Sequence, residues 1–369
     1  MKWSPQQDDA LTAVGRWLKD GHRQVFRLFG YAGTGKTTLA RHFAENLDGE
    51  VFFAAFTGKA AQVMRHKGCS GARTIHSLIY RPRGEEKSEE TGEMLPTFAI
   101  NRSSPLAKAS LVIIDECSMV DEELGRDLLS FGVPVLVLGD PGQLPPVSGG
   151  GYFTNDEPDA LLTEVHRQAR DNPIVELAMQ VREGGRLARG RYGSSRVISR
   201  DEVDQAEVLA ADQVLVGINR TRNLYNRRLR ELKGFTGRLP VSGDKLVCLR
   251  NDATKGLLNG SLWQVTHTGR VRSGALSLVV RPEEDAAERG SAKIKVPKAA
   301  FESDEELSWQ VRRRYDEFDF GYVLTVHKAQ GSQWDDIVLF DESWAFRDYR
   351  HRWLYTGITR AAERITIVQ

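Results

Sequence analysis

Short apolar runs recur through the first half of the chain, and segments with helical periodicity lie between them. Each run is nearly continuous in apolar residues, as strands buried on both faces should be. The runs are 25-VFRLFG-30, 51-VFFAAF-56, 111-LVIIDE-116 and 134-PVLVLGD-140. The segment 37-TTLARHFAENL-47 is amphipathic. The pattern predicts an α/β domain with a parallel sheet, whose chemistry lies in loops at the carboxyl ends of the strands.

Two stretches depart from this alternation. Residues 81–104 contain an acidic segment, a Thr91-Gly92 turn signal and the run 94-MLPTFAI-100. They predict an inserted β-hairpin, although a disordered surface loop also fits them. Residues 241–318 contain short strand-like runs separated by turn residues, which predict a small antiparallel barrel. A second α/β region begins near 214-VLVGI-218, and α/β sequence returns at 321-GYVLT-325 after the predicted barrel. The simplest interpretation is two α/β domains that each carry a β insertion.

Composition narrows the class of protein only slightly. The 369 residues suffice for two to four domains, and their net charge of +1 gives no general attraction to nucleic acid, so any such binding requires a local groove. Basic residues gather at 182–191 and 312–315, which fits a solvated surface as well as a phosphate track. Three widely spaced cysteines fit a reducing cytoplasm better than a zinc site. No signal-peptide or membrane-spanning pattern is present in the sequence.

A phosphate-binding loop follows the first predicted strand. The residues 30-GYAGTGKT-37 match G-x-x-x-x-G-K-[ST] between a strand and a helix, which is the context this motif requires. Backbone N–H groups of the loop converge on phosphate oxygens, Lys36 reaches the β and γ phosphates, and the Thr37 hydroxyl ligates Mg²⁺. We therefore expect ATP and Mg²⁺ as cofactors. The predicted nucleotide-binding residues in this segment are Gly30, Ala32, Gly33, Thr34, Gly35, Lys36, Thr37 and Thr38.

Two adjacent carboxylates end the third predicted strand. Burying such a pair is costly as mere packing, so 111-LVIIDE-116 is better interpreted as a functional strand end. Asp115 is placed to bind Mg²⁺ together with Thr37. Glu116 is placed to orient or deprotonate the attacking water.

A lone amide and a rigid proline pair follow the fourth strand, in 139-GDPGQLPPV-147. If this strand lies beside the one that ends at Asp115, Gln143 lies near the γ-phosphate and can sense its hydrolysis. The proline pair has fixed φ angles, so Pro145 and Pro146 can transmit a small displacement. The alternative is a rigid turn with an incidental glutamine.

Taken together, these segments resemble the superfamily 1 helicases of the 5′→3′ branch, which includes RecD and Dda. The segment 3-WSPQQDDAL-11 resembles the glutamine motif of this family. The segment 56-FTGKAAQVM-64 resembles motif Ia, and 73-RTIHSLI-79 resembles the motif that follows it. Motifs IV, V and VI are resembled by 163-TEVHRQ-168, 325-TVHKAQGSQWDDIVL-339 and 355-YTGITRA-361. The resemblance extends from Trp3 to the C-terminal residues.

The resemblance implies roles for residues outside the phosphate loop. Gln7 reads the adenine edge, and Gly331 lies near the nucleotide. Arg167 and Arg360 act with Lys36, Asp115, Glu116 and Gln143 as catalytic residues, the two arginines being in-cis arginine fingers. The residues implied to contact DNA are Thr57, Lys59, Thr74, His76, Pro146, Arg222, Thr325, His327 and Lys328.

The resemblance also implies a domain organisation. Residues 1–80 and 105–165 form RecA-like domain 1A, and residues 81–104 form a hairpin, 1B, that is a candidate wedge. Residues 166–240 and 319–369 form RecA-like domain 2A, and residues 241–318 form an SH3-like β-barrel, 2B. The expected fold class is therefore α/β, with two RecA-like P-loop NTPase domains in tandem.

The implied activity is ATP-dependent 5′→3′ translocation on single-stranded DNA with unwinding of duplex DNA, in replication, repair or recombination. Expected partners are single-stranded DNA and junctions of single- and double-stranded DNA, without a membrane, for a monomeric motor with replication or repair proteins as further partners. The expected location is the cytoplasm, for a bacterial or phage-encoded enzyme. Two alternatives stay open: an RNA helicase of the same superfamily, and a P-loop ATPase module without unwinding activity.

Overall fold

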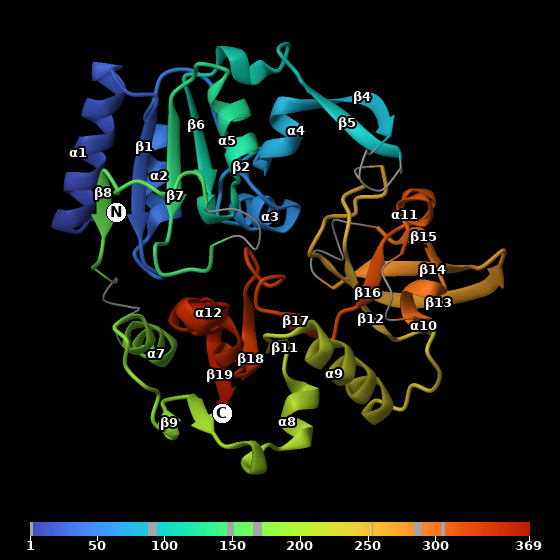
Figure 1. Ribbon diagram of the computed structural model, residues 1–369. Coiled ribbons are helices and arrows are strands. Elements are labelled where there is room, and N and C mark those ends of the chain that lie inside the picture. The colour runs from blue at the N-terminus through green and yellow to red at the C-terminus, as the bar shows by residue number, and fades with distance from the viewer. Residues whose placement is uncertain are drawn as a thin grey trace. The chain divides into compact units, whose positions relative to one another are not determined.

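A computed structural model describes residues 3–87, 94–145, 151–164, 172–252, 254–283, 290–303 and 307–369. The described chain divides into two compact units. Unit 1 comprises Met1–Arg81, Ala99–Glu202 and Gln330–Gln369, and unit 2 comprises Pro82–Phe98 and Val203–Ala329 (Figure 1). The domain boundaries expected from the resemblance stay predictions.

The first part of unit 1 is built on a parallel sheet with strand order β3-β2-β6-β7-β1-β8. Each of the four apolar runs forms one of these strands, as predicted, and β7 lies between β6 and β1. The strands are β1 (Val25–Gly30), β2 (Val51–Ala55), β3 (Arg73–Thr74), β6 (Leu111–Asp115), β7 (Val135–Gly139) and β8 (Ala160–Leu162).

Helices cover both faces of this sheet because its strands are apolar on both sides. One face packs against α1 (Pro5–Asp20), α2 (Lys36–Glu45) and α3 (Gly58–His66). The other packs against α4 (Ile75–Ile79) and α5 (Glu122–Leu129). The predicted helix at 37–47 is α2, which begins at Lys36 within the phosphate-loop motif.

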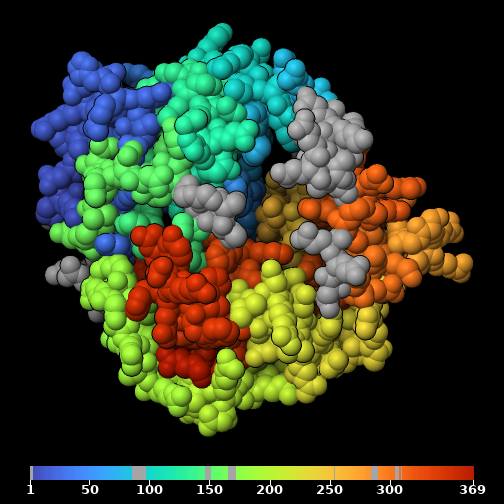
Figure 2. All heavy atoms as spheres, in the orientation of Figure 1, coloured from blue at the N-terminus to red at the C-terminus, as the bar shows by residue number. Residues whose placement is uncertain are grey.

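The rest of unit 1 is again α/β. Strand β19 pairs in parallel with β18 and with β10, and β10 pairs antiparallel with β9. Figure 2 shows the C-terminal residues of this part, in red, at the surface of the molecule. The elements are α7 (Pro173–Arg182), β9 (Gly190–Tyr192), β10 (Ser195–Ile198), β18 (Trp334–Phe340), α12 (Arg350–Ile358) and β19 (Ala361–Val368), with short 3₁₀ turns at Pro105–Lys108, Cys117–Met119, Arg200–Glu202 and Ser343–Tyr349.

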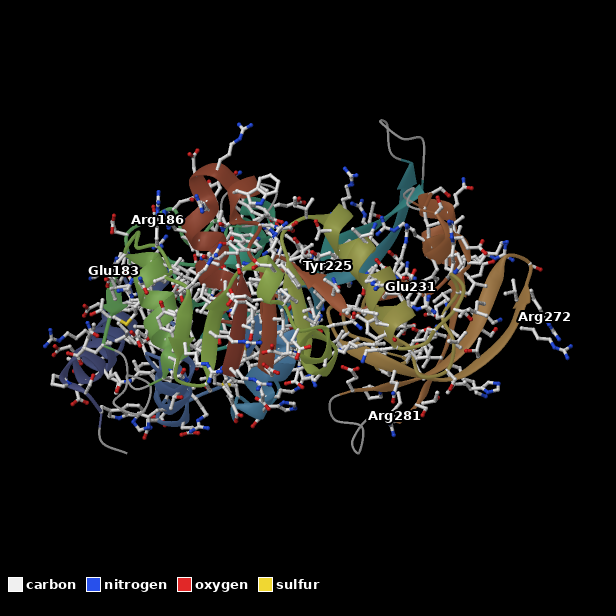
Figure 3. All side chains as sticks on the ribbon, turned by 90° about the horizontal axis from the view of Figure 1, so that it is seen from below. Glu183, Arg186, Tyr225, Glu231, Arg272 and Arg281 are labelled. Atoms are coloured by element: carbon white, nitrogen blue, oxygen red, sulfur yellow. The ribbon has the colours of Figure 1, made fainter. Side chains whose placement is uncertain are left out.

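Unit 2 contains the predicted antiparallel strands, in the order β15-β14-β13-β12-β16. Figure 3 shows Arg272 where the β13–β14 ribbon turns and Arg281 farther along β14. The antiparallel pairing confirms the predicted β insertion, while its closure into an SH3-like barrel stays a prediction. The strands are β12 (Lys245–Cys248), β13 (Leu262–Arg272), β14 (Ala275–Pro282), β15 (Ala292–Pro297) and β16 (Phe318–Phe320). Two short helices, α10 (Ala299–Glu302) and α11 (Trp309–Arg314), lie between β15 and β16 in the chain.

The α/β part of unit 2 is a parallel strand pair, β11 (Gln213–Val216) with β17 (Val323–Thr325). Its helices are α8 (Gln205–Ala210) and the basic α9 (Asn219–Leu232). Strands β4 (Tyr80–Lys87) and β5 (Met94–Ile100) pair with each other, as the predicted hairpin requires. Its predicted turn at Thr91-Gly92 lies outside the described residues.

A buried ion pair joins α9 to the start of the antiparallel sheet. Arg230 Nε and Nη2 each donate to one carboxylate oxygen of Asp244 at 2.8 Å. The Tyr322 hydroxyl and the Val241 N–H donate to the same carboxylate, at 2.9 and 2.8 Å. Because Asp244 is 0% exposed, its charge depends entirely on these donors for stabilisation.

We therefore expect Asp244→Ala to lower the free energy of unfolding by about 3–5 kcal/mol, because it leaves the Arg230 guanidinium buried without its counter-charge. Urea unfolding followed by circular dichroism measures this loss. Glu122→Ala is the control, since it removes only an exposed pair with Arg126 one helical turn away and should cost no more than about 0.5 kcal/mol. Equal urea midpoints for Asp244→Ala and the wild type would show that the buried pair stabilises nothing.

Candidate active site

The phosphate loop of unit 1 connects β1 to α2 through left-handed glycines. Gly33 and Gly35 have φ angles of 77° and 80°, which residues with a Cβ rarely adopt. Gly30 leaves no room for a side chain, because an added Cβ would lie 2.7 Å from Thr34 Oγ1 and 2.8 Å from Leu162 Cβ. The loop therefore needs glycine at these positions for conformation and for space.

The charged residues of the loop make contacts suited to phosphate and a divalent cation. Lys36 Nζ donates to the carbonyl oxygens of Gly30 and Tyr31, at 2.6 and 3.0 Å, so its ammonium lies within the loop. Thr37 Oγ1 donates to Asp115 Oδ2 at 2.9 Å. A hydroxyl and a carboxylate so placed are the oxygen donors that Mg²⁺ accepts beside nucleotide phosphates. Among the described residues, no group of three or more His, Cys, Asp or Glu side chains could hold a metal by itself.

Glu116 lies beside this pair in a strained conformation. Its φ of 52° and ψ of 45° are in the left-handed region, which costs a non-glycine residue about 1–2 kcal/mol. Its carboxylate is 3.9 Å from Arg360 Nη1, so the guanidinium reaches this end of the sheet. Burial raises the pKa of Glu116; Arg360 opposes this rise and Asp115 adds to it. A carboxylate with a raised pKa accepts a proton from water more readily.

Arg360 is held in position by the backbone around it. It follows α12 in the chain, is 5% exposed, and donates to the carbonyl oxygens of Thr356 and Ser332 at 3.1 and 3.2 Å. Figure 1 shows α12 close to the ends of the strands of the first sheet in unit 1. The structure thus brings Arg360 together with Lys36, Thr37, Asp115 and Glu116, although it is far from them in sequence.

The segment after β7 presents Gln143 to the same region. Gln143 is buried, and its Oε1 accepts no hydrogen bond from the described residues. Its neighbour Leu144 is held from both sides, by Thr356 Oγ1 at its N–H and by Gln330 Nε2 at its carbonyl oxygen. A buried amide oxygen without a donor suits a ligand such as water.

Gln7 lies against the phosphate loop. Its Nε2 donates to the Thr34 carbonyl at 3.1 Å, and its Oε1 accepts from the N–H of Ser4, the residue that caps α1. Trp3, which precedes α1, packs at a tilt against His42 with ring centres 5.0 Å apart. The structure therefore places the predicted adenine reader next to the loop. Thr38 lies in the first turn of α2.

Several residues expected to contact DNA lie elsewhere in unit 1, at the starts of two short helices. Thr57 and Thr74 cap α3 and α4, each accepting a hydrogen bond from a backbone N–H. Lys59 is buried and His76 is exposed. Gly331 packs on α3, since an added Cβ would lie 2.9 Å from Ala60 Cβ and 3.3 Å from Thr57 Oγ1. Its predicted contact with nucleotide stays a prediction.

The remaining DNA-contact candidates lie in unit 2. Arg222 and Lys328 line a cavity of about 970 Å³ beside α9 and β16, together with Arg227. Arg222 Nη1 donates to Asp319 at 2.6 Å. The pKa of Lys328 is lowered, chiefly by desolvation and to a smaller extent by the Arg222 charge. Figure 3 shows Tyr225 and Glu231 on α9, the helix along this cavity.

Two further DNA-contact candidates lie near β17. Thr325 is its last residue, and His327 lies just after it. Burial lowers the pKa of His327.

Two predicted site residues, Arg167 and Pro146, lie outside the described residues. Conversely, motif analysis missed two contacts at the phosphate loop. The Arg182 guanidinium carbon lies 3.7 Å from the centre of the Tyr31 ring, and the Tyr355 hydroxyl accepts a hydrogen bond from the Ala32 N–H at 3.0 Å. Tyr355 precedes the motif VI arginine by five positions, and this nearness to a predicted site residue was the one sequence feature that could have indicated its role.

The geometry defines a P-loop nucleotide site completed by an arginine from the C-terminal part of the chain. Residues 2–201, more than half of the chain, match the model of a family described as AAA domain, so the chain belongs to that family. Residues 320–368 match the UvrD-like helicase C-terminal domain. No helix in the described part of the chain is long and apolar enough to cross a membrane.

Curated relatives agree with the resemblance predicted from the motifs. The chain is 28% identical to the ATP-dependent RecD2 DNA helicase of Deinococcus radiodurans, over 93% of this chain and 46% of that protein. It is 32% identical to the ATP-dependent DNA helicase dda of Enterobacteria phage T4, over 48% of this chain and 42% of that protein. The chain thus spans less than half the length of these two relatives. The comparisons confirm the RecD-like and Dda-like resemblance.

Solved structures agree in fold. Bacteroides Pif1 bound to single-stranded DNA matches with a TM-score of 0.58 and 19% identity, over 99% of this chain and 92% of that one. Candida albicans Pif1 helicase matches with a TM-score of 0.58 and 19% identity, over 100% of this chain and 94% of that one. This likeness supports the predicted α/β fold with two RecA-like domains.

We expect Arg360→Ala to lower kcat for ATP hydrolysis about 10²–10³-fold with little change in KM, because the guanidinium matters most when charge develops on the transferred phosphoryl group. Steady-state hydrolysis over a range of ATP concentrations measures both constants. Arg364→Ala is the matched control, as Arg364 pairs with Asp336 and its side chain is 47% exposed. A raised KM with an unchanged kcat would contradict a finger role for Arg360.

Proposed function

We propose that this chain is an ATP-dependent DNA helicase motor that moves 5′ to 3′ on single-stranded DNA. The proposal rests chiefly on one observation: Arg360, supplied after α12, lies 3.9 Å from Glu116 at the same strand ends as Lys36 and Asp115. A nucleotide-binding module without a motor cycle has no need of an arginine from so distant a part of the chain. The helicase relatives and the helicase C-terminal match support the same conclusion.

In the proposed reaction, the phosphate loop binds the triphosphate and Lys36 neutralises its β and γ oxygens. Mg²⁺, held by Thr37 and Asp115, would offset phosphate charge when bound. Glu116 accepts a proton from the attacking water, and the free Oε1 of Gln143 orients that water by accepting its second hydrogen. Arg360 stabilises the charge that develops on the γ-phosphoryl oxygens.

Gln143 also links hydrolysis to the rest of unit 1. It precedes Leu144, whose backbone is bonded to Thr356 of α12 and to Gln330. Hydrolysis consumes the water that Gln143 orients, so the segment that ends in Pro145 can shift. The proline fixes φ, so the shift passes along the chain with little absorption. The same segment leads toward Pro146, a proposed DNA contact.

The DNA track is proposed to include the basic cavity of unit 2, where Arg222, Arg227 and Lys328 lie. These cations contact phosphates and not base edges, so binding should depend on salt and little on sequence. We further propose that the chain acts in the cytoplasm of a bacterial cell, on single-stranded tails and forks. Replication, repair or recombination would supply these substrates.

The proposal predicts strand polarity. With ATP, the chain should unwind a duplex that carries a 5′ single-stranded tail, and should fail on the same duplex with a 3′ tail. Gel separation of a labelled strand over time measures both. Lys36→Ala is the control for ATP dependence, because it removes a charge from the loop without removing core volume. Unwinding from the 3′ tail alone would overturn the polarity, and unwinding by Lys36→Ala would overturn the role of the ATP site.

A further inference from the structure

Tyr355 ties three parts of the ATP site together through one hydroxyl. The hydroxyl oxygen accepts from the Ala32 N–H of the phosphate loop at 3.0 Å and donates to Asp140 Oδ2 at 2.7 Å. Tyr355 belongs to α12, whose next residues lead to Arg360. Asp140 belongs to the segment that carries Gln143. The hydroxyl therefore joins the phosphate loop, this segment and the arginine-bearing helix.

Burial makes this link well defined. Tyr355 is 2% exposed and Asp140 is 4% exposed, so neither has water as an alternative partner. Desolvation and the Asp140 charge raise the pKa of Tyr355, so the phenol keeps its proton and donates a hydrogen bond to the carboxylate. Asp140 Oδ1 accepts from the Gly142 N–H at 2.9 Å, which fixes the orientation of the carboxylate.

The ring of Tyr355 sets the approach of the two segments. A Cβ added at Gly142 would lie 3.0 Å from Tyr355 Cε1, so the ring packs directly on the backbone there. One residue further along α12, Thr356 Oγ1 accepts from the Leu144 N–H at 2.9 Å. Thr356 also accepts from Arg360 Nε through its carbonyl oxygen. A displacement of Tyr355 would thus move Gln143 and Arg360 together.

We propose that Tyr355 is a positioning residue, whose hydroxyl holds Arg360 and Gln143 in register with the phosphate loop. It does not touch the reacting atoms. Its effect on rate comes through Arg360, because misplacing a catalytic group by about 1 Å can cost about 10²-fold in rate. This inference rests on the proposed ATP hydrolysis for its kinetic consequence, and on the hydrogen bond to Ala32 for its structural one.

The test replaces the hydroxyl alone. Tyr355→Phe keeps the ring against Gly142 and removes both hydrogen bonds. We expect kcat for ATP hydrolysis to fall about 10- to 100-fold with KM near the wild-type value. Tyr192→Phe is the matched control, since its hydroxyl bonds to the Ala188 carbonyl on an exposed part of unit 1. An unchanged kcat in Tyr355→Phe would overturn the inference, as would a loss confined to KM.

A double-mutant comparison separates positioning from general destabilisation. If Tyr355 acts through Arg360, Tyr355→Phe should cause little further loss of kcat in an Arg360→Ala background. Full multiplication of the two losses would show that the tyrosine acts independently, and would overturn the proposed route. If Tyr355→Phe fails to fold, Asp140→Asn replaces it as the test. This variant changes the carboxylate that accepts from the Tyr355 hydroxyl, and it should reproduce the kcat loss.

Hydrogen exchange at the phosphate loop tests the link without reference to activity. Removing the hydroxyl frees the Ala32 N–H, so a peptide that covers 30–37 should exchange faster in Tyr355→Phe than in the wild type or in Tyr192→Phe. Unchanged exchange would overturn the link. A wild-type chain that does not hydrolyse ATP would overturn the proposed function, and the exchange result would still decide whether Tyr355 holds the loop.

Discussion

The parallel strands β1, β6 and β7 end at one edge of a sheet, and this edge concentrates charge. Lys36, Asp115 and Glu116 are half-buried there and Asp140 is buried, so each is more stable with a partner than alone. The Thr37 hydroxyl donates a hydrogen bond to Asp115, and the Tyr355 hydroxyl donates one to Asp140. The Arg360 guanidinium lies near the Glu116 carboxylate. Tyr355 and Arg360 come from the C-terminal part of the chain. Pairing the charges thus requires bringing α12 to the phosphate loop.

This requirement explains why nucleotide chemistry and movement are linked in the proposed motor. A phosphate that enters or leaves the loop changes the charge that these partners face. Tyr355 lies on α12, Arg360 follows that helix, and Asp140 begins the segment 140–145. This segment and α12 are bonded to each other through Leu144 and Thr356. A local electrostatic change therefore acts on backbone segments, which is how ligand switches bias larger rearrangements. In unit 2, the buried Arg230–Asp244 pair fixes α9 beside the basic cavity in the same way, by making separation costly.

Much of this arrangement could be predicted from the sequence, for identifiable reasons. The runs that became β1, β2, β6 and β7 are long, apolar and bounded by glycine or charged residues, so their pattern was unambiguous. The phosphate loop has a fixed spacing that its chemistry imposes. Short strands such as β3, with two residues, and β8, with three, show no periodicity and were not predicted. Tyr355 was missed because it meets Ala32 across 323 positions, and nothing local to either residue indicates the partner.

ATP hydrolysis by this chain should be measured with and without oligo-dT, and with oligo-U at the same nucleotide concentration. We expect oligo-dT to raise the rate well above that of the chain alone, because strand binding and the ATP site belong to one motor, and above that with oligo-U, because the proposed track is for DNA. Equal rates with and without either polymer would contradict it, and would leave a P-loop ATPase with no nucleic acid to move along.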